Sequence, residues 1–94
     1  MKIAWTPRAQ HNLRDAARNL AQFNPHAALV MVRTIRAAPQ QLLNHPASGR
    51  PGRIDGTREL VISGTPCILP YRVRHDAIEI LAVIHTSRQW PNQF

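Results

Sequence analysis

The sequence predicts an α+β fold in which an N-terminal helical hairpin packs on a small twisted antiparallel β-sheet. Two segments of the first half each begin with a capping residue and a proline, then place apolar residues at helical spacing. A loop rich in glycine and proline follows at 45–58, and beyond it the apolar spacing shortens to that of strands. The predicted order is strand, helix, helix and three strands. A chain of 94 residues suits a single domain of this kind, spanning 1–94.

The first half of the chain predicts one strand and two helices. Residues 3–5 form a short apolar segment that is typical of an edge strand. Thr6 and Pro7 then supply an N-cap and a first helical residue, and Asn24 and Pro25 repeat the arrangement. Apolar stripes follow the two caps: Ala9, Leu13, Ala16, Ala17 and Leu20, then Ala28, Val32, Ile35 and Leu42.

The second half predicts three strands. Short turns at 64–66 and 75–77 separate three strand patterns, which cover 58–63, 67–74 and 78–85. In the middle strand, alternation places Arg72 on the face opposite Leu69 and Tyr71. The last strand is strongly apolar and ends at His85, after which polar residues follow.

Two prolines predict interruptions within these elements. Pro39 falls inside the second helical stripe, and a proline there costs about 3 kcal/mol, so we expect a kink or a break near 36–39. Pro70 removes one backbone donor from the middle strand. We therefore expect a bulge or an unpaired N–H at that point.

The charge of the chain predicts an anionic partner. The formal net charge is +7, and eleven of the twelve cationic side chains are arginine, whose planar guanidinium matches phosphate and carboxylate groups. Such an excess predicts binding to nucleic acid or to an acidic protein. Cys67 lies within an apolar strand pattern and predicts a buried thiol. Neither a membrane span nor a signal peptide is evident, so we expect a cytoplasmic protein without a membrane partner.

The candidate catalytic and binding residues form a basic group on the predicted sheet. The five histidines are scattered and the glycines form no phosphate-binding loop, so we expect neither a metal site nor a cofactor. The group consists of Arg58, Arg72, His85 and Arg88. If these side chains converged, the arginines would neutralise a phosphate and His85 would transfer a proton, while Trp90 would stack on a base.

Structural roles are the alternative explanation of the same residues. Two cross-strand ion pairs would occupy the arginines: Arg58 with Glu59, and Arg72 with Glu79. His85 would then be a strand-end residue that is hydrogen-bonded to a backbone carbonyl, and Trp90 would cover a small core.

Nearly the whole chain resembles the RelE/ParE superfamily of bacterial toxins, the toxic halves of type II toxin–antitoxin modules. The resemblance rests on five stretches in order: IAWTPRAQHNL, NPHAALVMVRTI, GRPGRIDGTRELVI, YRV and IEILAVIHTSRQWP. It implies two helices packed on a twisted antiparallel sheet, a growth-inhibiting activity, and a cognate antitoxin protein as partner. A non-toxic basic binding module, or a decayed toxin, is the alternative from another class.

The resemblance implies one of two activities. Ribonuclease members cut mRNA on the ribosome, and that activity would make Arg72, His85 and Arg88 catalytic. ParE-like members instead inhibit DNA gyrase. The ribonuclease pattern is incomplete, because Ile68 stands where that branch often has a catalytic arginine and no tyrosine lies near the C-terminus. We therefore expect a gyrase-directed toxin, with the ribosome-dependent mRNA endoribonuclease as the alternative. The expected binding residues are Arg50, Arg53, Arg58 and Trp90.

Overall fold

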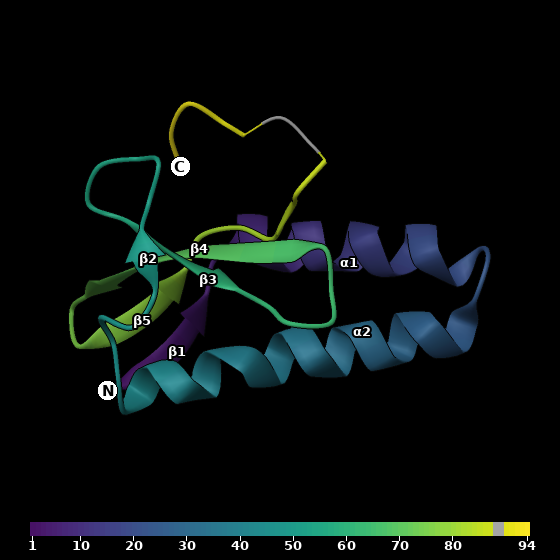
Figure 1. Cartoon of the computed structure of the whole chain (residues 1–94), viewed down its shortest axis with the longest axis horizontal. Coiled ribbons are helices and arrows are strands. Elements are labelled where there is room, and N and C mark those ends of the chain that lie inside the picture. The colour runs from purple at the N-terminus through teal and green to yellow at the C-terminus, as the bar shows by residue number, and fades with distance from the viewer. Residues whose placement is uncertain (88–89) are drawn as a thin grey trace.

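The computed structural model describes residues 1–87 and 90–94, which form a sheet with a helical hairpin packed on one of its faces (Figure 1). In chain order the elements are β1 (Lys2–Trp5), α1 (Pro7–Ala21), α2 (Pro25–Ala37), the 3₁₀ helix η1 (Ala38–Leu43), β2 (Arg50–Pro51), β3 (Arg58–Val61), β4 (Cys67–Arg74), β5 (Ala77–Ile80) and β6 (Ile84–His85). The predicted α+β fold, with a helical hairpin on a sheet, is confirmed.

Both helices begin where the sequence predicted. The Oγ1 of Thr6 accepts a hydrogen bond from the N–H of Ala9 at 3.1 Å, which satisfies a donor at the start of α1. The Oδ1 of Asn24 accepts from the N–H of Ala27 at 3.0 Å and caps α2 in the same way. The predicted interruption at Pro39 is also confirmed, because α2 gives way to the tighter helix η1 one residue earlier.

The sheet is mixed rather than purely antiparallel. Its strand order is β1-β5-β4-β3-β2, and β6 pairs with β4 as well. β1 runs parallel to β5, whereas the other pairs are antiparallel. The short strand β2 lies inside the predicted loop 45–58, and β3 ends at Val61 rather than at residue 63. Local apolar spacing carries no information about the partner of a strand, so none of these pairings could be read from it.

The predicted last strand, 78–85, is interrupted in the structure. The register along β4 changes between two pairs: Tyr71 with Ile80, and Ile68 with Ile84. Two residues of β4 therefore face three residues of the segment between β5 and β6. One extra residue on one strand of an antiparallel pair is a β-bulge.

Pro70 accounts for this bulge, as the sequence predicted. The N–H of Leu81 donates to the carbonyl oxygen of Pro70 at 2.9 Å, but Pro70 has no N–H to donate in return. The hydroxyl of Thr6 supplies that donor to the carbonyl of Leu81 at 3.1 Å. The Oδ1 of Asn12 accepts from the N–H of Val83 at 3.1 Å. Groups at the start of α1 thus satisfy the backbone of the bulge.

Tyr71 lies at the centre of the core between the sheet and the helices, with no exposed surface. Its hydroxyl donates to the carbonyl of Pro46 at 2.8 Å and accepts from the N–H of Gly49 at 2.9 Å. A Cβ atom on Gly49 would lie 2.5 Å from that hydroxyl, so the loop approaches the sheet closely enough to require glycine. The remaining core is apolar: Leu13, Ile35, Leu42, Leu69, Ile78 and Ile80.

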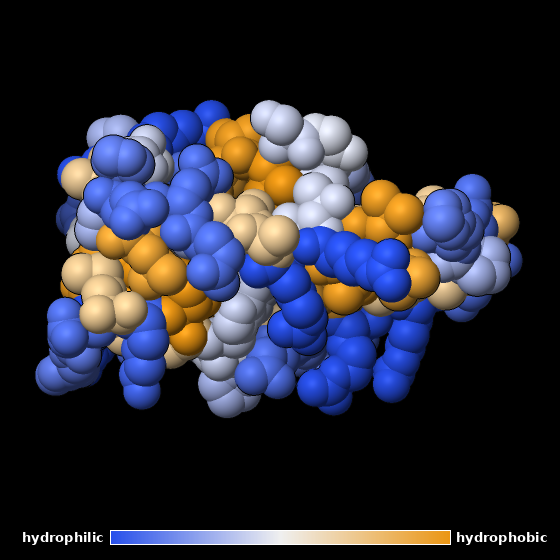
Figure 2. All heavy atoms as spheres, turned by 90° about the horizontal axis from the view of Figure 1, so that it is seen from below, coloured by the Kyte–Doolittle hydropathy of each residue, from blue (hydrophilic) through white to orange (hydrophobic). Residues whose placement is uncertain are grey.

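The surface on the side of α2 mixes apolar and hydrophilic side chains. Figure 2 shows this side, where apolar surface lies in patches between hydrophilic groups. Leu29 and Val30 of α2 are about half exposed. Within residues 1–87 and 90–94, no helix combines the length and the apolar character that crossing a membrane requires.

Candidate functional site

The sheet face opposite the helices, the outer face, carries two arginine–glutamate pairs. Arg50 of β2 lies beside Glu59 of β3, and paired residues of antiparallel strands share a face. Arg72 of β4 lies beside Glu79 of β5 in the same way. Glu59 is also opposite Pro70, which lies two residues from Arg72, so both pairs share the outer face.

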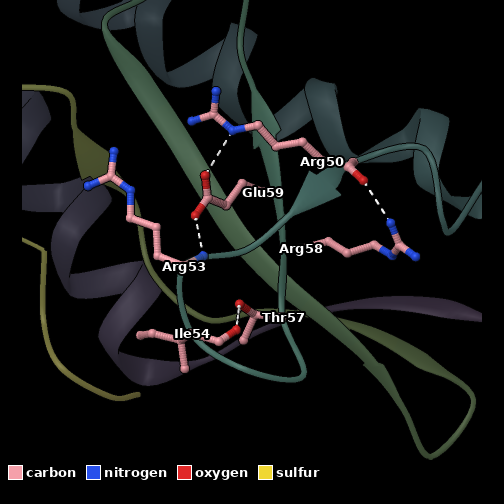
Figure 3. Close-up of polar contacts among 7 residues, drawn as sticks. Arg50, Arg53, Ile54, Thr57, Arg58 and Glu59 are labelled. Atoms are coloured by element: carbon pink, nitrogen blue, oxygen red, sulfur yellow. Dashed lines mark hydrogen bonds and ion pairs between the residues drawn. The ribbon is translucent and has the colours of Figure 1, made fainter.

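Glu59 fastens the loop between β2 and β3 onto the outer face (Figure 3). One carboxylate oxygen accepts from the Nε of Arg50 at 2.9 Å, and the other accepts from the backbone N–H of Arg53 at 2.9 Å. Glu59 is only 2% exposed, and a buried carboxylate is stable only when it is paired and hydrogen-bonded. This anchoring role of Glu59 was not predicted from the sequence, although Glu59 is the only acidic residue on the predicted strand that follows this basic loop.

Arg58 takes a different role from the other predicted binding residues. It is paired with Tyr71, so its side chain leaves the sheet on the helix side. Its Nη1 donates to the carbonyl of Gly49 at 3.0 Å (Figure 3). The ion pair expected between Arg58 and Glu59 is therefore absent, and Glu59 binds Arg50 instead. Arg58 therefore stabilises the loop backbone from the helix side of the sheet, and its side chain is not part of the outer face.

Arg53 and Trp90 contact one another, although they lie far apart in the sequence. The guanidinium carbon of Arg53 lies 4.2 Å from the centroid of the indole ring, which is a close cation–π contact. Figure 1 shows the loop between β2 and β3 and the C-terminal segment on the same side of the sheet. Trp90 thus holds the side chain of Arg53, whose backbone Glu59 already holds.

The ion pair expected between Arg72 and Glu79 is confirmed. The Nε of Arg72 lies 2.7 Å from the Oε1 of Glu79. This hydrogen bond, together with the nearby charges of Arg72, Arg74 and His75, holds the pKa of the Glu79 carboxyl below its ordinary value of 4.5. Glu79 is therefore ionised at neutral pH, and it fixes the orientation of the Arg72 guanidinium.

His85 lies on the opposite face of the sheet from Arg72. It is paired with Cys67, whose side chain belongs to the core between the sheet and the helices. Its Nδ1 accepts from the backbone N–H of Ser87 at 3.1 Å and lies 2.6 Å from the Ser87 hydroxyl. The expected hydrogen bond to a backbone carbonyl is thus replaced by one from a backbone amide. An accepting Nδ1 places the proton of the neutral ring on Nε2.

The structure does not bring Arg72 and His85 together. Arg72 lies five residues along β4 from Cys67, the partner of His85, which corresponds to about 17 Å at roughly 3.4 Å per residue. The bulge is the physical reason for the change of face. Without its extra residue, 78–85 would alternate regularly and His85 would share the face of Glu79 and Arg72. Arg88, the third predicted catalytic residue, lies outside the described residues.

A cavity beside His85 is lined by residues from distant parts of the sequence. Arg8 and His11 of α1 line it together with His85 and Trp90. The guanidinium of Arg8 donates to the carbonyl of Gln93 at 3.2 Å, which connects α1 to the C-terminal segment. These residues lie far apart in the sequence, and no motif spacing relates them. In the described part of the chain, no group of three or more histidine, cysteine or acidic residues is placed to hold a metal ion.

Comparison with known families decides the identity of the chain. Residues 3–90 match the family described as ParE toxin of type II toxin-antitoxin system, parDE. The chain belongs to this ParE toxin family. It is thus a toxin of a type II toxin–antitoxin system, and a cognate antitoxin is implied as its partner.

Individual relatives agree with this assignment. The chain is 46% identical over 90 residues to "Putative toxin Y4kP" of Sinorhizobium fredii, covering 96% of this chain and 93% of the relative. It is 30% identical over 87 residues to "Toxin RelE2" of Caulobacter vibrioides, covering 93% of this chain and 97% of the relative. A solved structure described as "Chromosomal ParDE TA system from P. aeruginosa" is similar at a TM-score of 0.80 and 28% identity, over 90% of this chain and 95% of that one.

Proposed function

We propose that this ParE-family toxin inhibits DNA gyrase by binding, in the cytoplasm, without hydrolysing a substrate of its own. The arrangement of Arg72 and His85 carries the proposal. A phosphodiester-cleaving site needs the proton-transfer group and the charge-stabilising group around one reacting phosphate, within about 3 Å of the atoms that they serve. Here these two groups lie on opposite faces of the sheet.

The test is a supercoiling assay with purified gyrase, relaxed plasmid and purified toxin. We expect the toxin to reduce supercoiling in a dose-dependent manner, and the cognate antitoxin to relieve the inhibition. His85→Ala is the informative variant, because this proposal gives His85 no role in gyrase binding and predicts full inhibition. Normal supercoiling at every toxin concentration, in a preparation that still binds its antitoxin, would exclude the proposal.

One observation favours the ribosome-dependent ribonuclease as a second candidate. Two imidazoles, those of His11 and His85, line one cavity together with the guanidinium of Arg8. Such a set contains groups able to accept a proton, donate a proton and neutralise a phosphate. This site would use Arg8 and His11 in place of the predicted Arg72.

Mapping mRNA 5′ ends after brief induction of the toxin tests the second candidate. Ribonuclease activity predicts new ends within translated codons and a loss of cleavage of about 100-fold or more in His85→Ala and in His11→Ala. The matched control is His26→Ala, which changes an exposed histidine of α2. Intact messages in cells with disturbed plasmid supercoiling would reject this candidate and support gyrase.

A further inference from the structure

We propose that the outer face of the sheet binds the phosphates of duplex DNA, so that the toxin contacts DNA directly while it acts on gyrase. The inference deepens the proposed gyrase function and rests on it for its biological meaning, but DNA binding itself can be measured without gyrase. Four arginines supply the site: Arg50, Arg53, Arg72 and Arg74.

The charge presented to solvent on the outer face is positive, although the face contains two glutamates. In each ion pair the carboxylate is the less exposed partner. The side chain of Arg50 is 52% exposed and that of Glu59 is 2% exposed. The corresponding values are 37% for Arg72 and 26% for Glu79. A polyanion that approaches this face therefore meets guanidinium groups first.

The glutamates leave the phosphate-binding ends of the arginines available. Both contacts are made through Nε: Arg50 binds Glu59 at 2.9 Å, and Arg72 binds Glu79 at 2.7 Å. A guanidinium has five N–H donors, so the four on its two terminal nitrogens remain for another partner. Figure 3 shows the terminal nitrogens of Arg50 directed away from Glu59. Such anchoring lowers the entropy lost when an arginine binds a phosphate.

Arg53 is immobilised by other means. Its backbone N–H is bound to Glu59 at 2.9 Å, and its guanidinium lies over the indole of Trp90 at 4.2 Å. Stacking on an aromatic ring leaves the N–H groups at the edge of the guanidinium free to bind in the plane. Arg74 is exposed and forms no ion pair among the described residues.

The spacing of the arginines suits a duplex. Arg50 and Arg72 are two strands and two residues apart, which is about 12 Å between Cα atoms at roughly 4.8 Å per strand and 3.4 Å per residue. This separation is comparable with the width of the B-DNA major groove, about 12 Å. Two rigidly held arginines can thus contact phosphates on the two sides of one groove.

A single-stranded partner fits the outer face less well. Binding of single strands depends on aromatic side chains on which successive bases stack. Trp90 contacts Arg53, whose guanidinium already covers one side of the indole ring. Tyr71 is fully buried on the other face. Within residues 1–87 and 90–94, the outer face therefore offers cations for a phosphate backbone and lacks a free aromatic platform for a row of bases.

Fluorescence anisotropy with a labelled 20-base-pair DNA, over a range of salt concentrations, tests the proposal. Four phosphate contacts predict that the logarithm of the binding constant falls with the logarithm of salt concentration with a slope of about −3.6. The double variant Arg53→Gln/Arg74→Gln should reduce the magnitude of that slope by about 2 and weaken binding at least 10-fold at low salt. Neither substitution removes the partner of a buried carboxylate side chain.

The matched control is Arg14→Gln/Arg18→Gln, which removes the same charge from two exposed positions of α1. The proposal predicts an unchanged slope for this control. An equal loss in both double variants would show attraction by net charge alone and would overturn the assignment to the outer face. Arg74→Gln alone, which does not touch the contact with Trp90, should lower the slope by about 1 and guards against misfolding of the double variant.

Two further results would distinguish a failure of the DNA-binding inference from a failure of the proposed gyrase function. Tighter binding of single-stranded RNA or DNA of the same length than of the duplex would reject duplex DNA as the ligand. DNA binding that depends on Arg53 and Arg74, in a toxin that leaves gyrase unaffected, would reject the proposed function but retain this inference. If both hold, Arg53→Gln/Arg74→Gln should inhibit supercoiling less than the control variant does.

Discussion

At one end of β4 the alternation of side chains predicts the observed contacts, and at the other end it does not. At the Arg74 end, β4 and β5 pair in regular register, and Arg72 meets Glu79 as alternation predicts. At the Cys67 end, the bulge changes the register before His85 is reached. Alternation of side chains thus predicts contacts only as far as the ladder is unbroken. In this toxin, the break decides whether the arginine and the histidine share a face.

Substitution of Tyr71, which lies between the two ends of β4, should destabilise the fold more than any other change proposed for this strand. Tyr71→Ala should lower the free energy of unfolding by about 3–5 kcal/mol, because a fully buried aromatic side chain is lost and leaves a cavity. Tyr71→Phe should cost about 1–2 kcal/mol, because the N–H of Gly49 and the carbonyl of Pro46 lose the hydroxyl. Urea denaturation measures both. Equal losses in the two variants would show that the aromatic ring contributes little.

A substitution at Thr6 tests the end of β4 where the bulge lies. Thr6→Val should lower stability by about 1–3 kcal/mol, because one hydroxyl both caps α1 and donates to the carbonyl of Leu81. Thr6→Ser retains the hydroxyl and serves as the control. In NMR spectra, the amides of Leu81 and Val83 should shift in the valine variant, whereas that of Glu79 should not. A shift confined to α1 would show that Thr6 does not support the bulge.

The turns at the two ends of β4 should both favour glycine, because each contains a residue with a positive φ. Gly64, before β4, has a φ of +80°, so Gly64→Ala should destabilise the fold by about 1 kcal/mol. Asp76, after β4, has a φ of +58° without being glycine, so Asp76→Gly should stabilise it by a similar amount. Thermal denaturation of both variants measures the comparison. A loss of stability in Asp76→Gly would mean that its contact with the N-terminal amine, at 3.8 Å, outweighs the backbone strain.

At the Arg74 end of β4, the pairing of Glu79 with Arg72 predicts a small dependence of stability on pH. The pKa of Glu79 is lowered in the folded state, so the ionised carboxylate stabilises the fold above the unfolded pKa. This contribution is lost as the pH falls through the folded pKa, which lies below 4.5. Arg72→Gln should raise the pKa of Glu79 towards its ordinary value, as measured by NMR titration of the carboxyl carbon. An unchanged pKa would mean that Arg74 and His75 alone cause the shift.

Local sequence was enough to predict the helices, their caps, the interruption at Pro39 and the positions of most strands. These features depend on neighbouring residues: a side-chain oxygen three residues from an amide, or a missing N–H in a helix. Pro70 likewise predicted a bulge. The basic character of the outer face followed from the sequence only in part. Strand alternation placed Arg72 and Arg74 on one face, whereas Arg50 and Arg53 lay in the predicted loop.

The contacts between distant segments could not be predicted in this way. The parallel pairing of β1 with β5, the two-residue strand β2 and the pairing of Glu59 with Arg50 all join segments that local spacing does not relate. Pro70 predicted a bulge, but it did not predict which strand would contain the extra residue. That residue fell between β5 and β6, where Thr6 and Asn12 can satisfy the displaced backbone. The position of His85 was decided there, because one inserted residue turns each later side chain to the other face.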